Sequence, residues 1–130
     1  MASEKLKEAG AKSVIPLDVS GAFHSSLMRP AADKFKNVLA GIAIAAPKIP
    51  VISNVDGRPE TTPELIRLNL AKQITSSVQW VATVEYIAQQ GVTDFIELGP
   101  GKVLSGLIRR TNPNLKVYNI EKPADFDKLP

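Results

Sequence analysis

The residue of this chain best suited to acid–base chemistry is its single histidine, His24. Imidazole titrates near neutral pH, so a histidine on a loop can take up and return a proton under ordinary conditions. His24 stands in the stretch VSGAFHSSLM, between an apolar run and a helical pattern. Loops that follow strands are where α/β proteins build sites, which makes His24 a candidate general base. The alternative is that it caps the following helix or packs beside Phe23.

A histidine base needs a nucleophile, which is usually a serine on a sharp turn such as G-x-S-x-G. None of the serines of this chain lies in that motif: two of them directly follow His24, and Ser105 falls inside a helical pattern. The sequence therefore predicts a base without a nucleophile. The amides Gln73 and Asn54 lie near the ends of predicted elements, where either could orient a histidine, but their spacing does not single them out.

A second candidate site is the glycine-rich stretch GPGKVLSG, residues 99–106, which turns a predicted strand into a helix. Such a turn can bind an anion at the helix N-terminus, so an independent phosphate-binding module is one hypothesis. The stretch matches neither the P-loop nor the dinucleotide-binding spacing. The favoured interpretation is a tight turn whose glycines let the helix pack closely on the sheet.

Composition excludes several classes of function. The chain has no cysteine, which rules out disulfides and thiolate chemistry, and with one histidine we expect no metal site and no bound cofactor. Its 16 basic and 13 acidic residues give a net charge of +3, scattered along the chain, so we expect no nucleic-acid partner. No apolar run is long enough to span a membrane and no secretory leader is recognisable, so we expect a cytoplasmic protein, or one of an organelle matrix.

The pattern of the remaining residues predicts alternating helices and strands. We expect helices over residues 2–9, 27–42, 62 to about 74, 76 or 77 to 91, and 102–110, and a last helix that begins at Pro123. The helix that ends at Gly91 is capped by Ser76 or Ser77, and its expected core face consists of Trp80, Val81, Val84, Ile87 and Ala88. We expect extended segments over 13–19, 49–55, 93–98 and 115–120, of which 93–98 is expected to be buried. Alternation of this kind predicts an α/β fold with a small, mostly parallel sheet and flanking helices. A covered sheet of three or four strands would normally continue, so we expect further strands that this chain does not contain.

Three motifs taken together resemble one enzyme family: GAFHS, SVQW and ELGPGKVLSGL. With the stretches around them, from about Lys5 to Arg110, they are similar to the C-terminal half of malonyl-CoA:acyl carrier protein transacylase. The resemblance implies part of an α/β-hydrolase-like acyltransferase fold. Residues 1–12 would then be the tail of a ferredoxin-like small subdomain, and residues 13–130 the C-terminal part of the large subdomain.

The resemblance also implies an activity: transfer of malonyl from malonyl-CoA to the phosphopantetheine thiol of acyl carrier protein in fatty-acid synthesis. It assigns His24 as the general base, the carbonyl of Gln73 as the group that orients it, Phe23 as an acyl-pocket residue that favours unbranched malonyl, and Asn54 as a neighbour of the substrate. The nucleophilic serine, the arginine that holds the malonyl carboxylate and an oxyanion-hole glutamine have no counterpart in this chain. We therefore expect the missing N-terminal half as a partner, and no activity from the chain alone.

Two other interpretations remain open at this point. The chain could be a non-catalytic interaction module that kept the fold and lost the chemistry. It could also be a segment of a polyketide-synthase-type acyltransferase, the near relative of the same family.

Overall fold

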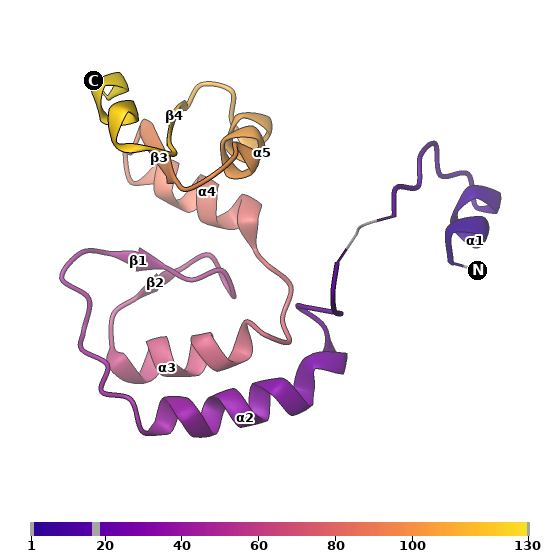
Figure 1. The fold of residues 1–130 in the computed structure, drawn as a ribbon, viewed down its shortest axis with the longest axis horizontal. Coiled ribbons are helices and arrows are strands. Elements are labelled where there is room, and N and C mark those ends of the chain that lie inside the picture. Colours follow the sequence, from indigo (N-terminus) through magenta and orange to yellow (C-terminus); the bar gives the residue numbers. More distant parts are fainter. Residues whose placement is uncertain (1, 17–18, 130) are drawn as a thin grey trace.

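The computed structural model describes residues 2–16 and 19–129, and Figure 1 shows their arrangement. Its elements are, in chain order, α1 (Ala2–Glu8), the 3-10 helix η1 (Ser26–Met28), α2 (Arg29–Ala40), β1 (Val51–Ile52), β2 (Pro59–Glu60), α3 (Pro63–Lys72), α4 (Trp80–Gln89), β3 (Asp94–Leu98), α5 (Val103–Thr111), β4 (Lys116–Ile120) and the 3-10 helix η2 (Pro123–Lys128). Helix α1 lies apart from the other elements in Figure 1, and none of its described residues is buried.

Helices α2 and α3 lie side by side and form one layer of the molecule (Figure 1). Each begins as the sequence predicts, with proline in its first turn, and the Thr62 hydroxyl accepts the amide N–H of Leu65 at 3.2 Å as an N-cap. Arg67 of α3 donates to the backbone carbonyls of Leu39 and Ile42, at the end of α2. This arginine therefore fixes the end of one helix to the flank of the other.

Strands β1 and β2 form a short antiparallel hairpin. Gly57 in its turn has a φ of +67°, and a Cβ placed there would lie 3.0 Å from backbone and side-chain carbons of Ala82. Only glycine combines that backbone conformation with such a close approach to α4. The strand expected over 49–55 is thus confirmed only at two residues, and it pairs within this hairpin rather than joining the parallel sheet.

Strands β3 and β4 form the expected small parallel sheet, in register from Asp94 opposite Lys116 to Leu98 opposite Ile120. Helix α5 connects them, and α4 packs against α5. The core of this unit consists of the buried residues Val84, Ile108 and Leu115, with Trp80, Ala88, Phe95 and Val117 packed around them. The α/β fold class is confirmed.

Three details of the sequence prediction are wrong. Strand β3 is not buried, since Ile96 and Leu98 are 51% and 73% exposed. Helix α4 begins at Trp80 rather than after Ser76 or Ser77, because the SVQ segment first bends to bond the hairpin through Gln79. Val81, expected in the core, is 53% exposed, and Thr83 is buried in its place.

The expected extended run over 13–19 has no strand at residues 13–16 or 19, and residues 17–18 lie outside the described part. The terminal helix from Pro123 is a 3-10 helix. Among the described residues, no helix has both the length and the apolar character needed to cross a bilayer. The division of the chain at residue 12 stays a prediction.

Candidate functional site

The backbone of His24 has an unusual conformation. Its φ is +61°, which makes it the one non-glycine residue with positive φ in the described part of the chain. A side chain in this left-handed region is strained, and such strain persists where surrounding contacts enforce it, often at functional sites. Two hydrogen bonds hold His24 here: its backbone N–H donates to Ile74 O at 3.1 Å, and its Nδ1 lies 2.9 Å from Gln73 O.

The two carbonyls bonded to His24, those of Gln73 and Ile74, directly follow the C-terminal end of α3. The amide of Gln73 still bonds Asn69 O, four residues back, whereas the amide of Thr75 bonds Lys72 O, three residues back. The helix ends in this tightened turn, and the last carbonyls of a helix have no partner within it. The carbonyls of Gln73 and Ile74 are therefore available to the histidine loop. They carry the partial negative charge of a helix C-terminus.

This contact determines which ring nitrogen can act as a base. A carbonyl oxygen only accepts, so the bond to Gln73 O requires the proton to be on Nδ1, and neutral His24 then has its lone pair on Nε2. The imidazole is exposed, so Nε2 is open to a reactant. The main-chain carbonyl does the work that a carboxylate does in a Ser-His-Asp triad, fixing the tautomer and the orientation of the ring.

The other two residues predicted for the site lie differently. Phe23 is 58% exposed next to His24, and its ring lies against Gly21, where a Cβ would be 3.4 Å from Cε2. Asn54 is exposed in the hairpin turn, and its backbone carbonyl accepts the amide of Gln79 at 2.8 Å. The structure thus brings Gln73 and His24 into contact, leaves Phe23 beside them, and shows no contact between the side chain of Asn54 and His24 among the described residues.

The two serines considered as nucleophiles have other partners. The hydroxyl of Ser25 donates to Ala22 O at 2.7 Å. Ser105 is 1% exposed, and its hydroxyl donates to Glu97 Oε2 at 2.5 Å. In the part of the chain that the structure describes, neither hydroxyl is hydrogen-bonded to His24. The described part of the site therefore contains an imidazole and the carbonyl that orients it, without a serine hydroxyl bonded to the ring.

Glu97 is a buried residue that the sequence analysis did not single out. Its carboxylate accepts the amides of Leu104 and Ser105, each at 3.0 Å, as well as the Ser105 hydroxyl. The hydroxyl bond, helped by the two amides and opposed by burial, lowers the pKa of Glu97 below its ordinary value. The signal in the sequence is an acidic residue at the end of a strand that leads through a glycine turn into a helix.

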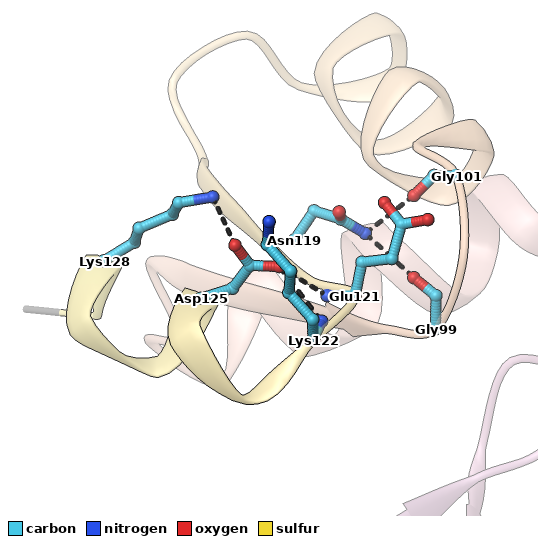
Figure 2. Close-up of polar contacts among 7 residues, drawn as sticks. All are labelled: Gly99, Gly101, Asn119, Glu121, Lys122, Asp125 and Lys128. Carbon is cyan, nitrogen blue, oxygen red and sulfur yellow. Dashed lines mark hydrogen bonds and ion pairs between the residues drawn. The ribbon is translucent and has the colours of Figure 1, made fainter.

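These contacts support one of the two interpretations of the 99–106 stretch. Two first-turn amides of α5, those of Leu104 and Ser105, are already bonded to Glu97 and are not free to bind an anion. Figure 2 shows the other side of the turn, where Asn119 Nδ2 donates to Gly101 O at 2.7 Å and Gly99 O at 3.4 Å. The stretch is a fixed turn between β3 and α5, as the favoured interpretation has it.

Figure 2 also shows the hydrogen bonds of Asp125, in the segment that follows β4. Asp125 accepts the amides of Glu121 and Lys122, each at 3.0 Å, and the ammonium of Lys128 at 2.5 Å. The Lys128 bond first, and then the two amide bonds, lower the pKa of Asp125 to about 2. The described residues contain no cluster of three or more His, Asp and Glu side chains that could hold a metal ion.

The parallel sheet with flanking helices agrees with the α/β fold of the acyltransferases. An acyl-carrier-protein S-malonyltransferase from Burkholderia pseudomallei superposes with a TM-score of 0.91 at 46% identity, over 98% of this chain and 41% of that one. A second structure, of a type II PKS acyl-carrier protein in complex with its malonyl-transacylase, superposes with a TM-score of 0.91 at 42% identity, over 98% of this chain and 41% of the matched chain. The structure therefore has the fold of the corresponding part of these enzymes.

Sequence comparison finds relatives along almost the whole chain. Malonyl CoA-acyl carrier protein transacylase from Bacillus subtilis is 47% identical over 127 residues, and that from Staphylococcus aureus is 45% identical over 122 residues. These matches cover 98% and 94% of this chain, so the similarity runs beyond the Lys5 to Arg110 range of the motifs. No family model matches. The chain is a homologue of part of the malonyl CoA-acyl carrier protein transacylases, and it spans about 40% of the length of these relatives.

Proposed function

We propose that this chain is the base-bearing C-terminal part of a malonyl-CoA:acyl carrier protein transacylase. The observation that carries the proposal is the contact of His24 Nδ1 with Gln73 O, which leaves Nε2 as a proton acceptor. The identity of 45–47% to transacylases supports the choice of acyl transfer over other base-catalysed reactions.

In the proposed reaction, His24 Nε2 takes the proton of a serine hydroxyl as the serine oxygen attacks the thioester carbonyl of malonyl-CoA. The proton then passes to the departing coenzyme A thiolate, and malonyl remains on the serine. In the second half-reaction, Nε2 takes the proton of the phosphopantetheine thiol, whose sulfur attacks the malonyl-serine. The serine oxygen leaves and recovers the proton, so His24 ends unchanged.

The proposal places the serine on a segment that this chain does not contain, together with the arginine and glutamine that the family resemblance implies. This chain spans about 40% of the length of its relatives, which agrees with such an arrangement. Residues 1–12 would end the small subdomain and residues 13–130 would form the C-terminal part of the large one. No cofactor enters the scheme, since the phosphopantetheine is carried by the partner protein.

The proposed partners are malonyl-CoA, an acyl carrier protein and the missing N-terminal half of the enzyme, in the cytoplasm or an organelle matrix. The similar transacylase in complex with a type II PKS carrier protein supports a carrier-protein partner. It also supports the polyketide-type carrier protein as a second candidate acceptor, beside that of fatty-acid synthesis.

The test is a chimera in which this chain replaces the corresponding segment of the Bacillus subtilis relative. We expect malonyl transfer to holo carrier protein by the chimera, none above background by the 130-residue chain, and a loss of about 100- to 10,000-fold on His24→Ala in the chimera. Asp127→Asn, an exposed change far along the chain, is the control. A folded chimera that transfers malonyl equally well with and without His24 would overturn the proposal and leave the non-catalytic module.

A further inference from the structure

The turn that holds His24 in its left-handed conformation is closed by a neighbouring side chain. Ser25 Oγ donates to Ala22 O at 2.7 Å, so this bond closes a turn over Phe23 and His24. The Ser25 carbonyl accepts the amide of Met28 at 3.1 Å, which starts η1. Ser25 is half-buried, between the exposed His24 and the exposed Ser26.

The direction of this hydroxyl bond is informative. Ser25 is the N-cap residue of η1, and a serine in that position usually accepts an amide N–H from the first turn of the helix. Within the described residues Ser25 makes no such cap bond, and its hydroxyl points back to Ala22 instead. The side chain therefore contributes to the histidine turn rather than to the helix.

A clamp at this point has a direct effect on the imidazole. With φ at +61°, His24 depends on its surroundings to keep a conformation that non-glycine residues avoid. Its amide bond to Ile74 O and its ring bond to Gln73 O both need that conformation, because they reach two successive carbonyls at the end of α3. If the turn relaxes toward negative φ, the amide and the ring can no longer meet both carbonyls.

We propose that Ser25 is a positioning residue for His24: its hydroxyl keeps the backbone of the histidine in the left-handed region, and thereby keeps Nδ1 on Gln73 O and the lone pair on Nε2. This rests on the proposed function only for its effect on acyl transfer. The effect on the tautomer of the imidazole does not depend on the proposed function and can be measured on the 130-residue chain.

The first test uses the ring ¹⁵N signals of His24, which are unambiguous because the chain has one histidine, provided that no histidine tag is attached. In the wild-type chain we expect the neutral ring to carry its proton on Nδ1. In Ser25→Ala we expect a shift toward the mixed tautomers of free histidine. Ser25→Thr restores a hydroxyl and should restore the wild-type spectrum, and Ser26→Ala, which changes an adjacent exposed serine, should leave it unaltered.

The second test measures malonyl transfer in the Bacillus subtilis chimera. Ser25→Ala should lower kcat by about 10- to 100-fold with little change in KM, as expected for a misplaced base, and Ser25→Thr should recover most of it. Circular dichroism separates this from unfolding, and the recovery by threonine does so independently.

The two proposals fail in different ways. If His24→Ala abolishes transfer while Ser25→Ala changes neither the tautomer nor kcat, the role of Ser25 is refuted and the proposed function stands. If His24→Ala has no effect on transfer but the tautomer still depends on Ser25, the positioning survives and the proposed function does not.

Discussion

Glu97 Oε2 accepts both the backbone amide and the hydroxyl of Ser105, at 3.0 and 2.5 Å, across the glycine turn that joins β3 to α5. Glu97 lies on the same face of β3 as Phe95, the face that packs on the core, and Ser105 is 1% exposed in the first turn of the helix. One carboxylate thus occupies the N-terminus of α5 and ties the strand to the helix that follows it.

Removal of the Ser105 hydroxyl should loosen this junction. We expect Ser105→Ala to lower the free energy of unfolding by about 1 kcal/mol, because one strong hydrogen bond to a buried carboxylate is lost while the two amide bonds remain. Urea unfolding monitored by circular dichroism measures the change. Ser26→Ala, at an exposed serine, is the matched control and should change stability by much less. Equal effects of the two substitutions would contradict the junction role.

Asp125 should make the stability of the chain depend on acid pH. Its folded pKa is about 2 against an ordinary value of 3.8, so it binds protons less readily folded than unfolded. Its contribution is therefore complete above about pH 5 and is lost progressively as the pH falls from there toward 2. Glu97, whose pKa is also lowered, acts in the same direction. We expect urea midpoints to fall between about pH 5 and pH 3.

The measurement is repeated with Asp125→Asn, which should flatten that dependence because the group can no longer titrate. Asp127→Asn is the control, since Asp127 is exposed and has no described hydrogen bond. Identical pH slopes for wild type and Asp125→Asn would show that the Lys128 and amide bonds do not stabilise the folded chain.

The parts of this fold that sequence alone could predict are those determined by local chemistry. Thr62 followed by Pro63 predicts the start of α3, and the structure has the threonine cap in place. Gly91, with a φ of +84°, ends α4 as expected. Three motifs, GAFHS among them, indicate the resemblance to the transacylases, and the relatives found by comparison carry that name.

The parts that sequence could not predict depend on contacts between distant residues. Nothing local shows that Ile74, 50 residues after His24 in numbering, supplies a carbonyl to it, nor that the histidine takes positive φ. The apolar residues of β3 predict burial, yet Ile96 and Leu98 are 51% and 73% exposed in the described part of the chain. A pattern gives the preference of a residue for burial, whereas the fold decides what covers it.

The contact between Gln73 and His24 uses the main chain of Gln73, so the glutamine side chain should be dispensable. Its amide group makes no hydrogen bond within the described residues. In the chimera we expect Gln73→Ala to retain malonyl transfer within about threefold, as for other substitutions that remove no specific contact. His24→Gln, which removes the titrating ring, should cost about 100- to 10,000-fold. A loss from Gln73→Ala as large as that from His24→Gln would mean that the side chain, not the carbonyl, orients the base.

Phe23 should limit the size of the acyl group that approaches His24. Its ring is next to His24 in sequence and 58% exposed. Under the proposed function, its bulk would crowd an α-methyl branch of the substrate. We expect Phe23→Ala in the chimera to raise the ratio of methylmalonyl to malonyl transfer by about tenfold, the effect typical of one methyl group in a pocket. Phe126, also 58% exposed but on η2, provides the control substitution Phe126→Ala. An unchanged ratio would remove Phe23 from the acyl pocket.

The uncovered face of β3 should bind the segment that this chain lacks. Ile96 and Leu98 alternate with Phe95 and Glu97, which face α5, so the two exposed side chains share the opposite face of a parallel sheet. Parallel sheets are covered on both faces, and burying one leucine contributes about 1.5–3 kcal/mol. We expect Leu98→Lys to weaken binding of the remaining segment of the Bacillus subtilis relative by at least about tenfold in calorimetric titration, and to reduce self-association of the chain in sedimentation. Phe126→Lys adds the same charge at an exposed apolar residue of η2 and should have little effect. Tight binding that is indifferent to Leu98→Lys would place the interface elsewhere on the molecule.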